Sequence, residues 1–202
     1  DALYNNGAYA IPGAVQDTPR AAIRELFDVN VFGQIDLINK CIPLMIRSDS
    51  PKIINCSSVL GFISLPYRGL YSATKYSIEA LTDALRRENY DSNIKFILIQ
   101  PGPIRTDIKK NSIKHFEKWI DWKKSKHKQT YENKVLKRLY DNNYKDSFTY
   151  YELQSDEVTK ILIKALNSKK PKKRYEITIY TKIAKIMVKL LPTNILDWIF
   201  KI

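Results

Sequence analysis

Three short apolar segments, each bounded by turn or polar residues, constrain the fold of this chain more than any other feature. They occupy residues 2–4, 52–55 and 96–100, and the stretches between them carry the start signals and the spacing of helices. This alternation favours an α/β fold in which helices cover both faces of a parallel sheet. Since ligands of such sheets bind beyond the carboxyl ends of the strands, we expect residues 5–6, 57–58 and 101–102 to line one crevice.

The other elements follow from local patterns. Thr18 followed by Pro19 is typical of a helix start, and that helix should run to about residue 47 with a kink near Pro43. Ser155 is a candidate cap for a later helix. The remaining expected elements are a helix over 70–90, a helical insertion over 108–150, a helix over 156–166, a strand over 175–179, and helices over 183–191 and 195–202.

A tyrosine and a lysine one helical turn apart, Tyr71 and Lys75, are the strongest candidates for chemistry. Four residues place the phenol and the ammonium on one helix face. The positive charge favours the phenolate, which would let the tyrosine exchange a proton near neutral pH. Ser58, thirteen residues before Tyr71, could hold a substrate oxygen beside it. Such a pair also arises by chance, so the signal lies in the whole ordered string.

That string, made of residues 55–61, Pro66 and residues 71–75, resembles the signature of the short-chain dehydrogenase/reductase family, classical type. The resemblance is close over residues 1–107 and looser from residue 156 to the end. It implies a doubly wound, Rossmann-like parallel sheet, of which this chain would form the C-terminal part. Three further motifs occur in the family's order: Asn5-Asn6-Gly7-Ala8, with the last two residues swapped relative to the family's Asn-Asn-Ala-Gly, then Asn30-Val31-Phe32-Gly33, then Pro101-Gly102-Pro103-Ile104-Arg105-Thr106.

The resemblance also implies a role for each matching residue. Tyr71 would be the catalytic acid or base, Lys75 would support it, Ser58 would hold the substrate oxygen, and Asn30 would hold a water in the proton path. In similar enzymes the position of residues 108–150 holds a substrate lid, and the alternative is a pair of helices that pack on each other. The implied contacts of the cofactor, NAD or NADP, are Asn6, Gly7, Tyr71, Lys75, Pro101, Gly102, Ile104 and Thr106.

No glycine-rich turn of the kind that holds a dinucleotide pyrophosphate occurs in the 202 residues, which include 6 glycines. We therefore expect a fragment that lacks the family's first three βα units and is inactive alone; a divergent enzyme without them is the alternative. Residues 1–202 would be one partial domain, with a core over 1–107, the insertion over 108–150, and C-terminal helices and the last strand over 151–202. NAD and NADP cannot be distinguished, because the residues that read the ribose 2′ position would precede this sequence.

Positive charge is concentrated in the second half of the chain. Residues 1–108 hold 11 basic and 11 acidic residues, whereas residues 109–202 hold 23 and 10, which supplies the whole net charge of +13. Such a surface attracts nucleic acid, anionic lipid or acidic proteins, or is a set of solvated lysine-rich helices. Because the segment 183–202 combines lysines with an apolar side, we expect core packing with weak contact to anionic membranes, and no nucleic acid. The cysteines and histidines have no metal-ligand spacing, so we expect no metal.

The favoured function is an NAD- or NADP-dependent oxidoreductase that interconverts an alcohol and a carbonyl compound. The aromatic residues of the insertion favour an apolar substrate, and a homo-oligomer is expected, located in the cytoplasm or at the periphery of a membrane. The alternatives are a non-catalytic scaffold or membrane-associated binding protein on the same fold, and an inactive fragment. The intact set of Ser58, Tyr71 and Lys75 argues against a scaffold, which would not need all three.

Overall fold

The computed structural model describes residues 1–141, 144 and 152–201. In these residues four parallel strands form one sheet in the order β1-β2-β3-β4. The register pairs Asn5 with Asn55 and Cys56 with Ile99, so the carboxyl ends of β1, β2 and β3 lie side by side. The parallel sheet is therefore confirmed, and so is the edge where the three loops were expected to meet. The strands are β1 (Ala2–Asn5), β2 (Lys52–Cys56), β3 (Lys95–Gln100) and β4 (Arg174–Glu176).

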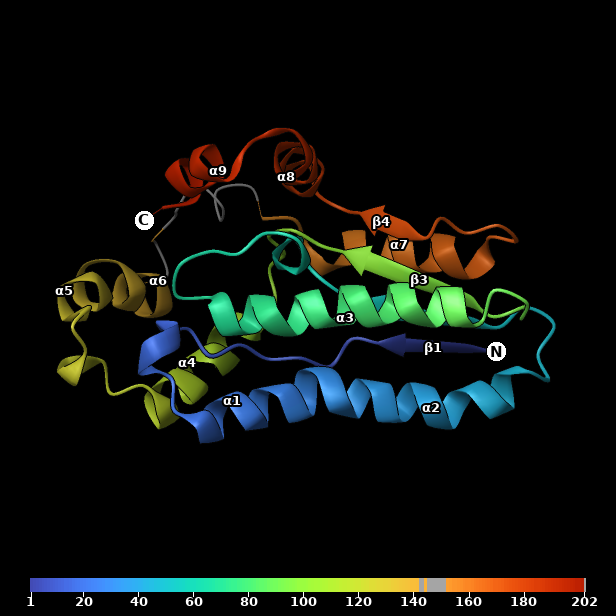
Figure 1. Ribbon diagram of the computed structural model, residues 1–202, viewed down its shortest axis with the longest axis horizontal. Coiled ribbons are helices and arrows are strands. Elements are labelled where there is room, and N and C mark those ends of the chain that lie inside the picture. The colour runs from blue at the N-terminus through green and yellow to red at the C-terminus, as the bar shows by residue number, and fades with distance from the viewer. Residues whose placement is uncertain (142–143, 145–151, 202) are drawn as a thin grey trace.

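Helices cover both faces of this sheet, as the alternation predicts (Figure 1). On one face Ile38 of α2 packs with Ile53 and Phe96 of the strands, and on the other face Ala165 of α7 packs with Ile97. Neighbouring residues of a strand point to opposite faces, so the continuous apolar run of β3 supplies both clusters. The covering helices are α2 (Gly33–Met45), α3 (Gly69–Glu88) and α7 (Ser155–Asn167).

The first long helix is interrupted by a π-helical turn. Helix α1 (Arg20–Phe27) runs into this wider turn, Asp28–Phe32, and α2 follows directly, so that α1 and α2 form one continuous rod in Figure 1. Pro43 lies inside the last turns of α2. The π-helical turn contains Asn30, and such turns frequently mark functional sites.

Two expected helix caps were wrong. The Thr18 hydroxyl donates a hydrogen bond to the Ala14 carbonyl, and Pro19 holds the cap position of α1. Ser155 is the first residue of α7 and not its cap. In both cases the residue type favours a helix start, but the backbone enters the helix one residue away from the expected position.

The described part of the insertion is helical and packs on the main body of the protein. Phe116, Tyr131 and Leu139 share one buried cluster with Leu26 of α1 and Leu70 of α3. Residues 142–143 and 145–150 of the expected insertion lie outside the described residues. The elements are α4 (Ile108–Trp119), a 3-10 turn at Trp122–Lys124, α5 (Lys128–Thr130), a π-helical turn at Tyr131–Val135, and α6 (Leu136–Tyr140).

The last strand is shorter than the expected strand over residues 175–179. It ends at Glu176, and α8 (Ile179–Leu190) begins where the strand was expected to end. Thr178 explains the difference, because its hydroxyl accepts a hydrogen bond from the Thr181 N–H and caps the helix. Helix α9 (Thr193–Phe200) follows after Pro192. None of the helices in the described residues is both long and apolar enough to cross a membrane.

Candidate active site

The loop after β2 is fixed to the loop after β3 by backbone hydrogen bonds that continue the sheet. The N–H of Ser57 donates to the Ile99 carbonyl over 2.8 Å, and the N–H of Val59 donates to the Pro101 carbonyl over 2.8 Å. Ser58 lies between these two bonds, so its position relative to Pro101 is set by the sheet itself. The predicted serine loop and the predicted cofactor loop are therefore neighbours.

Tyr71 and Lys75 face this loop from the first turns of α3. The Lys75 side chain is 2% exposed, and its Nζ donates a hydrogen bond of 2.7 Å to the Cys56 carbonyl at the end of β2. The same Nζ lies 5.7 Å from the centre of the Tyr71 ring, within the range of a cation–π contact. The shared helix face predicted from their spacing is present, and the buried ammonium is anchored to the strand end.

Asn30 is joined to the same helix through Thr74. Its side-chain amide is fully buried and donates to the Tyr9 carbonyl over 2.8 Å and to the Thr74 hydroxyl over 3.2 Å, while its oxygen accepts from the Tyr9 N–H. The Thr74 hydroxyl in turn donates to the backbone carbonyl of Tyr71 over 2.7 Å. A chain of hydrogen bonds thus links the π-helical turn to the turn of α3 that carries the tyrosine and the lysine.

The two serines of the loop differ in their environment. The Ser58 hydroxyl oxygen accepts a hydrogen bond of 3.1 Å from the Leu60 N–H, and this leaves the hydroxyl hydrogen for donation to another group. The Ser57 hydroxyl is buried and has no hydrogen-bond partner in the described residues. Both serines are buried, so spacing to Tyr71 remains the reason to prefer Ser58.

The predicted cofactor residues lie along the carboxyl edge of the sheet and in the loop that leads into α4. Asn6 is exposed and accepts a hydrogen bond from the Tyr4 phenol, and the carbonyl of the exposed Gly7 accepts from the Gln34 amide. Ile104 pairs with Leu153 in an isolated parallel bridge. Thr106 accepts a weak hydrogen bond of 3.4 Å from the Ile108 N–H at the start of α4.

Gly102 is held against the start of α8, a contact that the sequence did not predict. A Cβ atom on Gly102 would lie 2.1 Å from Oγ1 of Thr178 and 2.9 Å from Oγ1 of Thr181. Both threonines are buried, and their hydroxyls are hydrogen-bonded to each other over 2.9 Å. The cofactor loop and the N-terminus of α8 therefore form one packed unit. A Pro-Gly loop and a Thr-x-x-Thr helix start were visible separately, but nothing in the sequence pairs them.

Tyr67 is a residue that the sequence did not single out. Its φ of 60° is uncommon for a residue other than glycine, and such backbone strain clusters at functional sites. Its carbonyl accepts from the Gly13 N–H over 3.0 Å, and its ring lies edge-on to the ring of Tyr131, with centres 5.2 Å apart. Tyr67 thus connects the insertion to the start of α3, four residues before Tyr71.

The insertion is also tied to the loop that bonds Asn30. The His115 ring of α4 stacks on Tyr9 with ring centres 3.9 Å apart, and Glu25 of α1 accepts hydrogen bonds from Tyr9 and Lys118. The hydrogen bond from Lys118 holds the pKa of Glu25 below its usual range, and burial raises the pKa of Tyr9. Burial also lowers the pKa of His115, despite the nearby Glu25.

The two C-terminal helices cover the serine loop. Ala184 of α8 is buried in a cluster with Leu60 and other residues of that loop, and Phe200 of α9 and Tyr71 pack against the same cluster. The insertion helices and α9 lie beyond the carboxyl ends of the strands (Figure 1). The candidate site is therefore bounded by α3, the insertion and the C-terminal helices.

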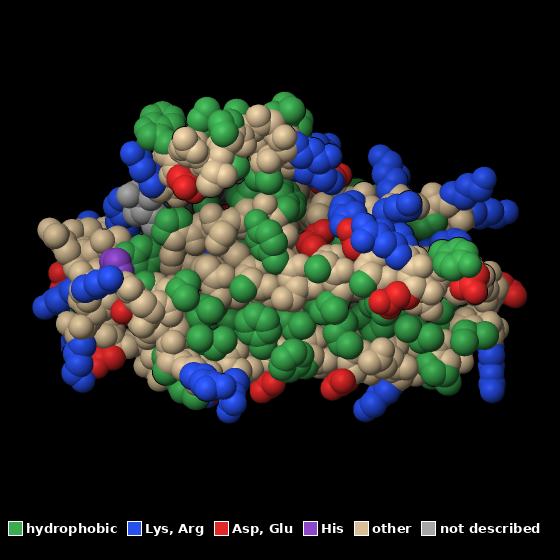
Figure 2. Space-filling view, viewed as in Figure 1, with side chains coloured by type: hydrophobic (Ala, Val, Ile, Leu, Met, Phe, Trp, Pro, Cys, Tyr) green, Lys and Arg blue, Asp and Glu red, His purple; other side chains and the backbone are tan. Residues whose placement is uncertain are grey.

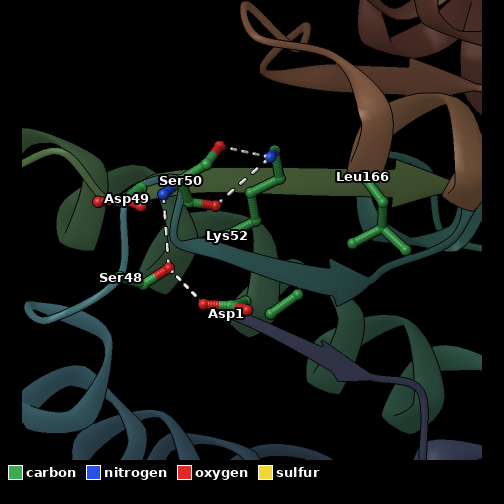
Figure 3. Close-up of a pocket in the computed structure, with 7 residues that line it drawn as sticks. Asp1, Ser48, Asp49, Ser50, Lys52 and Leu166 are labelled. Carbon is green, nitrogen blue, oxygen red and sulfur yellow. Dashed lines mark hydrogen bonds between the residues drawn. The ribbon is translucent and has the colours of Figure 1, made fainter.

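One cavity of about 340 Å³ lies at the opposite, amino-terminal edge of the sheet (Figure 3). Its polar side chains are bonded to one another: Ser48 donates to Asp1 over 2.6 Å, and Lys52 donates to the Ser50 hydroxyl over 2.8 Å. It contains none of the residues predicted for catalysis or cofactor binding. Within the described residues, no group of three or more His, Cys, Asp or Glu side chains could hold a metal ion.

Comparisons with known proteins identify the family and the fold of this chain. The sequence pattern of the short chain dehydrogenase family matches residues 1–116. The chain is 31% identical to the probable short-chain type dehydrogenase/reductase VdlC of Helicobacter pylori, over all of this chain and 70% of that protein. It is 32% identical to the NADPH-dependent 3-dehydrocapnine reductase of Ornithobacterium rhinotracheale, over 98% of this chain and 68% of that protein. A short chain dehydrogenase from Burkholderia cenocepacia, solved in complex with NADP, superposes with a TM-score of 0.72 at 18% identity, over 98% of this chain and 70% of that one.

The chain belongs to the short-chain dehydrogenase/reductase family, and it spans about two thirds of the length of the relatives that it matches. The family, its Rossmann-like parallel fold and its oxidoreductase class are confirmed as predicted. The cofactor class of this family, NAD or NADP, is also the class predicted from the sequence.

Proposed function

We propose that the protein interconverts an alcohol and a carbonyl compound, with hydride passing between the substrate carbon and NAD or NADP. The observation that carries this proposal is the placement of Lys75. Its buried ammonium is anchored to the Cys56 carbonyl and lies beneath the ring of Tyr71, next to the loop that holds Ser58. A buried ammonium is costly unless hydrogen bonds or an opposite charge compensate it. The Cys56 carbonyl provides one such hydrogen bond, and negative charge that develops on the Tyr71 phenol during the reaction would provide the opposite charge.

In the reducing direction Tyr71 donates its phenolic proton to the substrate carbonyl oxygen, and in the oxidising direction the phenolate accepts the proton of the alcohol. Ser58 donates a hydrogen bond to the same oxygen, since the Leu60 N–H bonds the Ser58 hydroxyl oxygen and leaves its hydrogen available. Lys75 stabilises the phenolate form of Tyr71, which is the product of proton donation and the reactant of proton acceptance. The cofactor supplies the hydride when bound, and the protein positions the substrate beside it.

Asn30 would hold a water of the proton path by accepting a hydrogen bond from that water. Both N–H donors of its amide are used by Tyr9 and Thr74, so the amide cannot also donate to a water. The π-helical turn places Asn30 opposite Thr74, one residue before Lys75. The residue would therefore fix the turn of α3 that carries the tyrosine, in addition to any contact with water.

The residues present fit the nicotinamide end of the cofactor. Lys75 has three N–H donors, and Cys56 is its hydrogen-bond acceptor in the described residues, which leaves donors for ribose hydroxyls. Gly7 has open space around its Cα, which suits close approach of a ligand to the backbone. Asn6, Pro101, Gly102, Ile104 and Thr106 are the other proposed contacts. No residue of this sequence forms a glycine-rich pyrophosphate turn.

An apolar substrate fits the surroundings of Tyr71. The ring packs against a cluster of aliphatic side chains that also receives Phe200, and the aromatic rings of Tyr67 and Tyr131 lie at the insertion. The NADPH-dependent 3-dehydrocapnine reductase of Ornithobacterium rhinotracheale is 32% identical to this chain, over 98% of this chain and 68% of that protein. We propose an apolar alcohol or carbonyl compound as the substrate class, with the insertion as its lid.

A homo-oligomer is also proposed, through the outer side of the rod formed by α1 and α2 together with α3. Hydrophobic side chains gather between these helices on the face shown in Figure 2. Contiguous exposed apolar surface of this kind marks interaction sites. The exposed hydrophobic residues of α2, α3 and the π-helical turn before α2 include Phe32, Leu37, Leu44 and Tyr76.

The test is Tyr71→Phe in the intact enzyme, assayed by NADPH and NADH oxidation with medium-chain aldehydes and cyclic ketones. We expect kcat to fall by about 10²–10⁴-fold, because the hydroxyl transfers the proton, while the KM for the cofactor stays nearly unchanged. The matched control is Tyr90→Phe just beyond the same helix, which removes an exposed phenol and should leave kcat unchanged. Near-normal kcat in Tyr71→Phe would contradict the proposed function.

A further inference from the structure

The outer side of α8 carries an apolar stripe that no described part of the chain covers. Ile179, Ile183, Ile186 and Leu190 recur at helical spacing, and the side chains of Ile179, Ile186 and Leu190 are 68%, 58% and 75% exposed. The stripe faces away from Thr181 and Ala184, which are buried against the protein. Exposed apolar surface on this scale marks an interaction site.

Helix α9 extends the same surface. Trp198 is 69% exposed, and Ile195 and Ile199 are exposed as well. Ile195 precedes Trp198 by three residues and Ile199 by four, which is the spacing of neighbours on a helix surface. Figure 2 shows hydrophobic side chains on the outer side of α8 and α9, with basic side chains next to them. Tryptophan is enriched where a protein meets the headgroup region of a bilayer, because its ring is apolar and its N–H is polar.

The charges around this surface are almost all positive. In residues 179–201 the charged side chains are four lysines, Lys182, Lys185, Lys189 and Lys201, and one aspartate, Asp197. Lys185 is paired with Glu176, whereas Lys182 and Lys189 are exposed and lie seven residues apart on one side of α8, next to the stripe. An apolar face flanked by lysines is the pattern of a helix that lies in a membrane interface.

We propose that the outer face of α8 and α9 docks on an anionic lipid bilayer. A second copy of the chain fits this face less well, because an antiparallel two-fold packing of α8 on α8 would put Lys182 and Lys189 of both copies on the same side of the contact. Anionic headgroups complement these lysines, and the acyl region accepts the isoleucines and Trp198. The proposal goes beyond the catalytic one, since no proposed catalytic residue contributes to the face.

Docking would place the membrane next to the site. The inner side of the same two helices covers the serine loop, where Ala184 is buried and Phe200 packs with Tyr71 against one cluster. The bilayer would therefore lie one helix layer away from the loop that holds Ser58.

The test is flotation of the intact protein with vesicles of phosphatidylcholine alone or with added phosphatidylserine, at low and high salt. We expect binding to the phosphatidylserine vesicles at low salt, and weaker binding at high salt because the lysine contribution is screened. The double variant Ile186→Ser and Leu190→Ser should lose binding. Its control, Ile46→Ser with Ile163→Ser, removes two exposed aliphatic side chains, one just beyond the end of α2 and one on α7, and should bind as the wild type does.

The charge contribution is tested separately with Lys182→Gln and Lys189→Gln, where each neutralised lysine should lower the partition coefficient by about fivefold. Lys126→Gln with Lys134→Gln makes the same change in net charge on exposed lysines of the insertion and should have little effect. The proposal is overturned if the folded wild type does not bind the vesicles. It is also overturned if the α8 lysine variants and the insertion lysine variants weaken binding equally. A third contrary result is a change of sedimentation coefficient in Ile186→Ser with Leu190→Ser while vesicle binding is unchanged.

Discussion

The phenol of Tyr131, inside the insertion, donates a hydrogen bond of 2.9 Å to the carboxylate of Asp17 and accepts one of 2.8 Å from the Ala14 N–H. Tyr131 is fully buried, and Ser125 donates to the same carboxylate oxygen. The insertion is therefore fastened to the segment before α1 by a polar contact inside an apolar cluster. Burial and the bond to Asp17 together raise the pKa of Tyr131, so the phenol stays neutral and keeps donating.

Tyr131→Phe should weaken this fastening. The change removes the hydroxyl, so that the Ala14 N–H and the Asp17 carboxylate each lose a hydrogen-bond partner. This loss should lower the free energy of unfolding by about 1–2 kcal/mol. Urea unfolding followed by tryptophan fluorescence measures the change, since Trp119 and Trp122 pack against the same cluster. Tyr140→Phe is the control, because the Tyr140 phenol bonds Glu117 on the exposed surface of the insertion. Equal effects of the two variants would contradict the role of the buried bond.

Gly102 and Gly7 should respond differently to the same substitution. Gly102→Ala places a methyl group 2.1 Å from the Thr178 hydroxyl oxygen, so the start of α8 must move, and overpacking of this kind costs about 1–3 kcal/mol of stability. Gly7→Ala meets nothing within 4 Å and should leave stability unchanged while raising the KM for the cofactor, if the backbone there approaches the cofactor as proposed. Thermal unfolding and cofactor titration of both variants separate the two effects. A destabilised Gly7→Ala would show that its backbone is constrained by the protein itself.

The stability of the protein should depend on pH through Asp83 of α3. Burial acts to raise the pKa of this carboxyl, but hydrogen bonds from Arg174 and Arg86 outweigh it and hold the pKa below its usual range. A group whose pKa is lower in the folded protein stabilises the fold above its unfolded pKa, and this stabilisation is lost as the pH falls through the folded value. Asp83→Asn should therefore be less stable than the wild type at neutral pH, by about 1–2 kcal/mol.

The difference in stability between the wild type and Asp83→Asn should shrink below about pH 4, where an unperturbed aspartate begins to protonate. Urea midpoints of wild type and variant between neutral and acidic pH measure it. Asp91→Asn, at an exposed aspartate just beyond α3, is the control and should show no such convergence. A difference that stays constant as the pH falls would show that the loss comes from packing rather than from charge.

The sequence predicted the parts of the fold that depend on local pattern. The apolar runs of β1, β2 and β3 and the spacing of Tyr71 to Lys75 are local features, and the structure places them as expected. The last strand, expected over 175–179, is present but ends at Glu176, because the Thr178 hydroxyl accepts a hydrogen bond from the Thr181 N–H and begins a helix there. Tertiary contacts such as that of Gly102 with Thr178 have no signature in either segment alone.

The candidate site shows the same division. Ser58, Tyr71 and Lys75 could be found because their spacing is fixed by one loop and one helix turn. The anchor of Lys75 on the Cys56 carbonyl and the bond from Asn30 to Thr74 could not, because each joins segments many residues apart. The left-handed backbone of Tyr67 is also invisible in sequence, since tyrosine does not favour that conformation. The sequence expected the apolar side of residues 183–202 to pack mainly inward, whereas Ile186, Leu190 and Trp198 point outward.

Lys75→Met should separate the two roles proposed for this lysine. Methionine fills a similar buried volume but carries no charge, so the phenolate of Tyr71 loses its stabilising partner and the ribose loses a donor. We expect the rate at neutral pH to fall by about 10²-fold or more, the pH–rate profile to move toward alkaline pH, and the KM for the cofactor to rise. A steady-state pH series of kcat in the intact enzyme, together with cofactor titration, measures all three.

The matched control is Lys52→Met. Lys52 is also a buried lysine, but it lies at the amino end of β2, and its ammonium bonds Ser50 at the edge of the sheet opposite the candidate site (Figure 3). Its replacement removes the same charge from another buried position, so it can change stability but should leave the shape of the pH–rate profile unchanged. If Lys52→Met shifts the profile as far as Lys75→Met does, the effect is a general one of net charge, and Lys75 does not act on Tyr71 directly. If only Lys75→Met shifts it, the ammonium that is anchored on Cys56 sets the proton affinity of the reacting phenol.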